Sequence, residues 1–258
     1  MMATYTQTFT LTAGDVAENH KGMQQIGNMA DKGFSKENLV TIQNWFQERD
    51  CNTEMIKLHN NLPDKKNENK AYVLIIREGV NKILNDMTGA AKLYTEQENL
   101  EKDTKALMYG RVVNKHARYN LCFAEEAQEP NYIEGKGRII SFNNVVLLNS
   151  IRQRLGEILP EASNLMFEGN YYYDVTSCGI GWHGDYERAK VIGIRLGASM
   201  PLCFNWFHKN QPLGKKITLN INHGDIYVMS EKTVGQDWKK MNSYTLRHSA
   251  GADKYTKL

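Results

Sequence analysis

The segment Leu165-Met-Phe-Glu-Gly-Asn-Tyr-Tyr-Tyr173 begins a part of the chain that has the composition of β-strands almost to its end. Runs rich in β-branched and aromatic residues follow it at Val191–Gly197, Leu202–Phe207, Ile217–Ile221, Asp225–Met229, Tyr244–Ser249 and Lys254–Leu258. Glycine-containing turn signals separate these runs. Many short strands after one or two helices favour an α+β, mainly β protein, built as a double-sheet jelly roll backed by helices.

Upstream of this part, the sequence indicates two helices and one buried strand. Residues 145–158 place aliphatic side chains at helical spacing, Tyr72–Ile76 is an apolar run typical of a buried strand, and Ser35 is suited to cap a helix. The polar run 63–70 has almost nothing to bury, which predicts a linker or exposed loop. We therefore expect a partly helical N-terminal extension over 1–62, with a Thr-rich flexible start, and a folded domain over 71–258.

Composition sets the broad class of protein. The chain is 41% hydrophobic and 24% charged, an ordinary balance for a soluble globular protein, and no stretch approaches the roughly 20 apolar residues of a membrane span. Its four cysteines form no C-x-x-C pair and no signal peptide is evident, so we expect an intracellular protein, cytoplasmic or nuclear, without membrane association. The net charge of +3 permits contact with a polyanion without demanding it. A monomer is favoured.

The segment Gly179-Ile-Gly-Trp-His-Gly-Asp-Tyr-Glu187 carries the most informative motif. His183 and Asp185 are two residues apart, so on an extended segment both side chains point to the same side. They would form two-thirds of a facial 2-His-1-carboxylate iron site, which leaves positions open for a bidentate 2-oxo acid and for dioxygen. An isolated H-x-D pair is more often a strand-end histidine bonded to a turn aspartate. His248, on a late strand 65 residues after His183, is the best candidate for the third ligand.

These landmarks together resemble the AlkB-like 2-oxoglutarate/iron(II) dioxygenases, which oxidise alkylated or methylated nucleobases and occasionally proteins. The resemblance covers about residues 105–258 and rests on Asn170-Tyr-Tyr, Trp182-His-Gly-Asp-Tyr-Glu187, Ile194-Arg-Leu-Gly197, Leu219-Asn-Ile-Asn-His-Gly-Asp-Ile-Tyr-Val-Met229 and His248. It implies a double-stranded β-helix that uses iron(II), 2-oxoglutarate and dioxygen, with ascorbate as a stimulant. It also implies the triad His183, Asp185 and His248, with Asn170 and Tyr172 donating to 2-oxoglutarate.

The residue that anchors the far carboxylate of 2-oxoglutarate is left open. AlkB-like enzymes use arginines on the strand after the distal histidine, but this chain has no arginine after Arg247. Lys254 and Lys257 are three apart, so only one of them would face inward on a regular strand. Arg195 is a competing candidate, because it alternates with apolar neighbours and would face into the barrel. The alternative for Arg195 is an ordinary solvent-facing position on a half-buried strand.

Substrate contacts are expected from a lid region at about 105–135 and from the residues after the H-x-D motif. The basic and aromatic residues of the lid suit phosphate contacts and base stacking, although a solvated edge hairpin has the same composition: Tyr109, Arg111, Lys115 and Arg118. By resemblance Glu187 would read a flipped base, with Arg188 pairing with phosphate or with Glu187 itself.

Three functions are compatible with these patterns. The leading one is oxidation of a methylated nucleobase in DNA or RNA, either as DNA repair or as nucleic acid modification. The second is hydroxylation of a protein side chain or small metabolite at the same iron site. The third is a non-catalytic binding module, which the intact triad disfavours. The insertion Ser230–Lys240 has no counterpart in the repair enzymes that the chain resembles, which weakens the case for simple repair.

Overall fold

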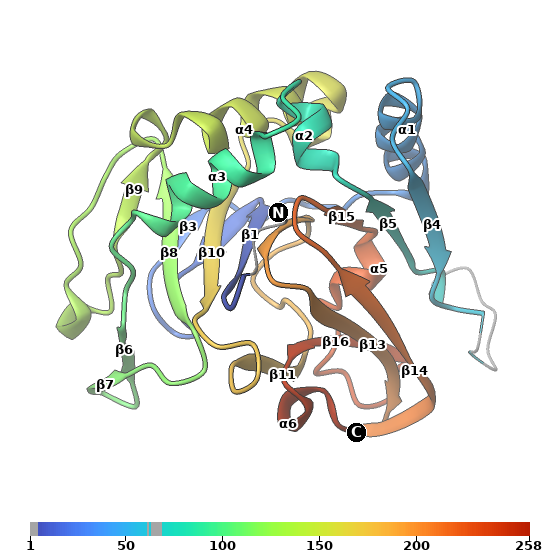
Figure 1. Cartoon of the computed structure of the whole chain (residues 1–258). Helices are drawn as coiled ribbons and strands as arrows, with labels where there is room; N and C mark the ends of the chain where they lie inside the picture. The colour runs from blue at the N-terminus through green and yellow to red at the C-terminus, as the bar shows by residue number, and fades with distance from the viewer. Residues whose placement is uncertain (1–4, 61, 63–68) are drawn as a thin grey trace.

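The computed structural model describes residues 5–60, 62 and 69–258, which form three layers (Figure 1). Helices cover one face of an eight-stranded sheet, and a four-stranded sheet lies against its other face. The predicted linker at 63–70 falls almost entirely outside the described residues. Within the described part of the chain, no helix is long and apolar enough to cross a membrane.

The main sheet has the strand order β4-β5-β15-β12-β1-β10-β8-β9, and its strands pair antiparallel except for β8 with β9. Its strands are β1 (Thr8–Gly14), β4 (Thr53–Lys57), β5 (Tyr72–Ile76), β8 (Tyr119–Ala124), β9 (Ile139–Ser141), β10 (Met166–Tyr172), β12 (Val191–Gly197) and β15 (Ile226–Met229). Strands β5, β12 and β15 are buried along their whole length because both faces of this sheet are covered.

The second sheet has the order β11-β16-β13-β14 and contributes the other wall of the central core. Its strands are β11 (Gly179–His183), β13 (Met200–His208), β14 (Gln211–Ile221) and β16 (Thr245–Gly251). Side chains of both sheets meet in one buried cluster, in which Phe204 and Leu246 of the second sheet join Val73 and Ile75 of the main sheet. Two small hairpins complete the strands: β2 (Val16–Glu18) with β3 (Gln25–Gly27), and β6 (Lys105–Met108) with β7 (Arg111–Asn114).

The helices pack on the far face of the main sheet, where Leu74 and Ile76 join their apolar stripes in the larger core cluster. They are α1 (Lys36–Gln47), α2 (Gly79–Ile83), α3 (Gly89–Glu98) and α4 (Val146–Ile158), while the short α5 (Glu231–Val234) and α6 (Asp253–Thr256) lie near the second sheet (Figure 1). Short 3₁₀ turns occupy Tyr132–Glu134, Phe142–Asn144 and Pro160–Ala162. Ser35 caps α1 as predicted, in a reciprocal capping box with Asn38.

The predicted class, a mainly β α+β protein with two sheets backed by helices, is confirmed. The finer expectation of a jelly roll stays a prediction. Two local expectations are wrong. Lys254–Leu258 is not a strand, because residues 253–256 form α6. The Thr-rich start is not flexible from Thr8 onward either, because β1 lies between β10 and β12 in the middle of the main sheet. The partly helical N-terminal part also joins this sheet where β4 pairs with β5.

The sequence of β1 explains this second difference. In Thr-Phe-Thr-Leu-Thr-Ala-Gly, Phe9 and Leu11 point to the helix side and join the core there. The alternating Thr10 and Thr12 point to the other side and line a cavity between the two sheets. Threonine is β-branched and suits a strand, and its small hydroxyl leaves room for that cavity.

Candidate metal centre and its cavity

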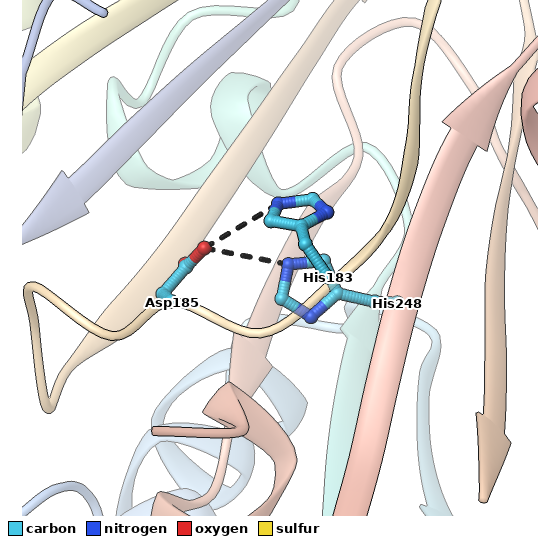
Figure 2. A group of neighbouring side chains, drawn as sticks. All are labelled: His183, Asp185 and His248. Atoms are coloured by element: carbon cyan, nitrogen blue, oxygen red, sulfur yellow. Dashed lines mark ion pairs between the residues drawn. The ribbon is translucent and has the colours of Figure 1, made fainter. Parts of the chain in front are cut away.

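His183, Asp185 and His248 converge on one point at the end of the second sheet (Figure 2). The Nε2 atoms of both histidines lie 3.5 Å from the same oxygen, Oδ1 of Asp185. Their ligand atoms all lie within 4.8 Å of one another, which is the spacing that a shared metal ion requires. The structure therefore brings together the three predicted ligands as a possible metal-binding group.

Two strands and one tight loop hold these side chains in place. His183 ends β11 and lies opposite His248 on β16, after an irregularity in the register of the two strands. The chain then turns through Gly184, where any Cβ would collide with the carbonyl oxygen of Gly235. The backbone N–H of Asp185 donates to the carbonyl of Val234 at 3.0 Å, which fixes the loop against the segment after α5. Only glycine fits between the two ligands because backbone occupies the space for a side chain.

The electrostatics of the triad suit a cation. Burial, together with the neighbouring His248, lowers the pKa of His183 to about 3, so its imidazole is neutral and its Nε2 lone pair is available. The Nδ1 atom of His183 lies 2.7 Å from the carbonyl oxygen of Gly181, a contact that orients the ring. Burial alone would raise the pKa of Asp185, but Arg188 and the two histidines hold it well below its usual range. Asp185 is therefore a carboxylate, as a metal ligand must be.

The triad opens onto a cavity of about 530 Å³ between the two sheets. Its walls come from β1, β10, β12 and β15 of the main sheet, from β11, β13 and β16 of the second sheet, and from the β2–β3 hairpin. This volume lies in the range of small-molecule and cofactor pockets, which is roughly 300–1,000 Å³. A metal at the triad would therefore face a partly open cavity that is large enough for a co-substrate and part of a substrate.

Arg195 lines this cavity from β12 and is 1% exposed. Its Nη1 donates to the carbonyl of Met200 at 3.2 Å, and within the described residues its Nε has no partner and no carboxylate pairs with it. Burial lowers the pKa of this guanidinium. The solvent-facing alternative for Arg195 is wrong, because the side chain points between the two sheets. A buried guanidinium without a counterion is a site for an anion.

The other residues predicted to hold a co-substrate divide into two groups. Asn170 and Tyr172, both on β10, are buried and line the cavity with Arg195. Lys254 and Lys257 are exposed at and just after α6 and do not line it. The two lysines are therefore not placed to anchor a ligand in this cavity, because the strand that would have carried them inward is a helical turn.

The predicted lid residues also separate. Tyr109, 99% exposed, and Arg111 lie at the tip of the β6–β7 hairpin, outside the cavity. Lys115 is buried and donates to Asn19 Oδ1 at 2.7 Å and Asn120 Oδ1 at 2.9 Å. Only Arg118 lines the cavity, where its Nε donates to Asn170 Oδ1 at 2.5 Å.

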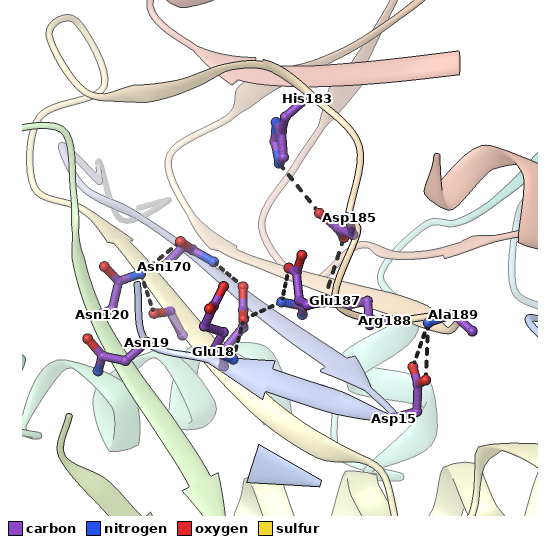
Figure 3. Close-up of polar contacts among 12 residues, drawn as sticks. Asp15, Glu18, Asn19, Asn120, Asn170, His183, Asp185, Glu187, Arg188 and Ala189 are labelled. Carbon is purple, nitrogen blue, oxygen red and sulfur yellow. Dashed lines mark hydrogen bonds and ion pairs between the residues drawn. The ribbon is translucent and has the colours of Figure 1, made fainter. Parts of the chain in front are cut away.

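Glu187 and Arg188 lie in a charged cluster beside Asp185 (Figure 3). Arg188 is 2% exposed, and its Nη2 donates to Glu168 at 2.6 Å and to Glu187 at 2.9 Å. Its Nε lies 3.8 Å from Asp185 Oδ2. Arg188 therefore forms buried ion pairs around Asp185, one of the candidate metal ligands, and is not free to contact a phosphate.

Sequence reasoning missed the contribution of the N-terminal segment to the cavity. Glu18, Asn19, His20, Lys21 and Gln25 line it from the β2–β3 hairpin. The available signal is the alternation of threonine with apolar residues in β1, which predicts a strand with one apolar face but does not predict the burial of its threonine face.

The metal-binding triad and its cavity define the chain as a candidate metal-dependent enzyme on a β-rich fold. No established protein-family model matches the chain. It is 49% identical over 257 residues to a protein of Acanthamoeba polyphaga mimivirus that carries the name "Uncharacterized protein R156", and the match covers 97% of this chain and 98% of the viral protein. The chain therefore belongs to the same family as this mimivirus protein.

Proposed function

We propose that the chain is an iron(II)- and 2-oxoglutarate-dependent dioxygenase that oxidises a methylated nucleobase in DNA or RNA. The observation that carries the proposal is the pairing of two features in one cavity: a His-Asp-His group at one place, and at another the buried Arg195, which no carboxylate among the described residues contacts. A ligand with a metal-chelating end and a second carboxylate would satisfy both. The resemblance to AlkB-like dioxygenases supports the same reading.

The residues present fit the two absent groups. Two imidazoles and one carboxylate on one side of a metal suit iron(II) or manganese(II) and leave the opposite side open. For the co-substrate, Arg195 supplies an unpaired cation, and Asn170 and Tyr172 supply polar groups on the adjacent wall. Iron(II) with 2-oxoglutarate would supply oxidation of a C–H bond by dioxygen, with release of succinate and carbon dioxide.

In this scheme the residues of the chain bind the metal and the co-substrate and shield them from solvent. His183, Asp185 and His248 hold the metal, and Arg195 orients the co-substrate by its far carboxylate. The apolar side chains of Leu202 and Met229 line the same cavity and lower its local dielectric constant, which strengthens the polar contacts beside them.

A polyanionic substrate is favoured by the residues of the cavity wall and lid. Lys21, Arg118 and Lys239 line the cavity together with Tyr186, which is 60% exposed. The Nζ of Lys239 lies 4.1 Å from the centroid of the Tyr186 ring. Cations beside an accessible aromatic ring suit a phosphate backbone and a stacked base. Tyr109 and Arg111 on the β6–β7 hairpin add the same combination outside the cavity.

The test is a substrate panel with the iron-loaded protein, 2-oxoglutarate and ascorbate. Methylated DNA, methylated RNA and a peptide pool are incubated separately, and mass spectrometry measures oxidised nucleosides, oxidised peptides and succinate. We expect an oxidised or demethylated nucleoside with the wild-type protein and none with Asp185→Ala. Untouched nucleosides beside a hydroxylated peptide would instead assign the site to a protein hydroxylase and overturn the nucleic acid proposal.

A further inference from the structure

The β2–β3 hairpin supplies a carboxylate, Glu18, that has no role in the proposed binding of iron and 2-oxoglutarate. Glu18, at the end of β2, lines the cavity together with Glu168, Asp185 and Glu187. Its backbone N–H donates to Glu168 Oε2 at 3.2 Å, and its Oε1 accepts from the N–H of Gly22 at 3.0 Å. The backbone of Glu18 is therefore fixed beside Glu168, and the hydrogen bond from Gly22 orients its side chain at the cavity wall.

The hairpin itself is fixed to the metal loop. The Asp15 carboxylate, in the turn between β1 and β2, accepts from the backbone N–H groups of Ala189 and Lys190 at 2.8–3.1 Å and of Ala30 at 2.7 Å. These bonds join the start of the hairpin to the loop that follows Asp185. The position of Glu18 relative to the triad is thus set by the fold.

Glu18 differs from the other carboxylates in having no cation. Asp185 would bind the metal cation, while Glu168 and Glu187 pair with Arg188 at 2.6 and 2.9 Å. Among the described residues no lysine, arginine or histidine pairs with Glu18, and burial with the charges of Glu187 and Glu168 raises its pKa to about 6. A half-buried carboxylate in this situation is stabilised by a ligand that donates an N–H to it.

A second observation indicates that the cluster is incomplete without a ligand. Arg188 points into it and is 2% exposed, yet its Nε and Nη1 have no hydrogen-bond partner within the described part of the chain. Buried N–H groups of a guanidinium rarely lack a hydrogen-bond acceptor in native proteins. Both Arg188 atoms are shielded from solvent and Nε faces Asp185 at 3.8 Å, so a polar group that enters beside Glu18 and Glu187 would reach them only after the Arg188 side chain turns toward it.

We propose that Glu18 is a specificity-determining residue that accepts a hydrogen bond from the exocyclic amino group of the target base. The enzyme then prefers a methylated cytosine or adenine over a methylated uracil, whose corresponding edge presents a carbonyl oxygen. This inference rests on the proposed function. A base is favoured over a cationic peptide side chain because Lys21, Arg118 and Lys239 line the same cavity and attract phosphate.

The test uses one chemical pair, 5-methylcytosine and thymine, which share the 5-methyl group and differ at the amino or carbonyl edge. Single-stranded oligonucleotides that differ at this one base are titrated into metal-free protein, and fluorescence anisotropy measures binding. We expect the wild-type protein to bind the 5-methylcytosine strand about tenfold more tightly, as one charge-assisted hydrogen bond allows. Glu18→Gln should reduce this ratio to about one. Glu157→Gln, on the exposed face of α4, is the matched control and should keep the wild-type ratio.

Unfolding curves of Glu18→Gln confirm that the variant is folded, and Glu18→Ala provides a second variant without the acceptor. Equal binding of the two strands by the wild-type protein, or an unchanged ratio in both Glu18 variants, overturns the inference. Iron-dependent oxidation of both oligonucleotides without base preference would do so while leaving the proposed function in place. Oxidation of a peptide with no oligonucleotide binding would overturn both.

Discussion

His183 and His248 lie opposite each other in the β11–β16 ladder, with ring centroids 4.4 Å apart and both Nε2 atoms 3.5 Å from Asp185 Oδ1. The two imidazoles come from segments 65 residues apart in sequence, so their meeting depends on the pairing of two strands and on nothing local. Asp185 reaches the same point from the loop after β11. The geometry of the candidate metal site therefore depends on the pairing of β11 with β16.

Replacement of Arg195 by methionine should weaken binding of 2-oxoglutarate. Methionine fills a similar buried volume but cannot pair with a carboxylate, and a hydrogen bond to a charged group contributes about 1.5–3 kcal/mol. We expect the dissociation constant of the manganese-loaded protein for 2-oxoglutarate to rise about tenfold to a hundredfold in calorimetric titrations.

Lys254→Ala and Lys257→Ala are the matched controls for Arg195, because both lysines are exposed and lie outside the cavity. Their affinity for 2-oxoglutarate should equal that of the wild-type protein. A large loss in either lysine variant, with Arg195→Met unaffected, would show that the anchor has been assigned to the wrong residue.

Gly184→Ala should damage the metal site and the stability of the fold together. The added Cβ would lie within van der Waals distance of the Gly235 carbonyl oxygen and 2.9 Å from Trp238 Cβ, so backbone must move. We expect a loss of about 1–3 kcal/mol in the free energy of unfolding and weaker metal binding. Gly181→Ala is the control, because nothing lies within 4 Å of its added Cβ. Equal unfolding free energies for the two variants would refute this account of the loop.

The buried Lys115 predicts a pH dependence of stability. Burial lowers the pKa of its ammonium from 10.5 to about 7, so between these values the folded protein binds fewer protons than the unfolded chain. Stability contributed by this group is therefore lost as pH falls toward 7 and recovered as pH rises. Between pH 7 and pH 9 the wild-type protein should gain about 2 kcal/mol relative to Lys115→Met.

Urea unfolding at several pH values measures this difference. The loss of hydrogen bonds to Asn19 and Asn120 shifts the variant by a constant amount, so the slope against pH is the informative quantity. Parallel stability curves for the two proteins would mean that Lys115 is not a buried titrating group.

The parts of the site that depend on short patterns were predictable from sequence. The H-x-D spacing on an extended segment placed His183 and Asp185 together, and the alternation of Arg195 with apolar neighbours indicated a side chain that faces away from them. The ends of β5 and β12 were also predicted correctly: β5 is a continuous apolar run, which marks a strand buried on both faces, and β12 is rich in β-branched residues and ends at a glycine.

The contribution of the N-terminal part was not predictable in the same way. Thr8, Thr10 and Thr12 look polar in isolation, and their burial arises only because β10 and β12, more than 150 residues away, enclose β1. The prediction for the short segment after β16 was wrong for another reason. Lys254–Leu258 is too short for hydrophobic periodicity to separate a strand from a helical turn, and the turn at Asp253–Thr256 removes the lysines from the cavity.

The most direct test of the metal site is the visible spectrum of the protein under anaerobic conditions. Iron(II) and 2-oxoglutarate are added to the wild-type protein and to Asp185→Ala, and the metal-to-ligand charge-transfer absorption of an iron-bound 2-oxo acid is measured. We predict that the band appears in the wild-type protein, saturates at one iron per chain and is absent from the variant. A wild-type protein that binds neither iron nor 2-oxoglutarate, or a band of equal strength in Asp185→Ala, would contradict the assignment of His183, Asp185 and His248 as the iron ligands.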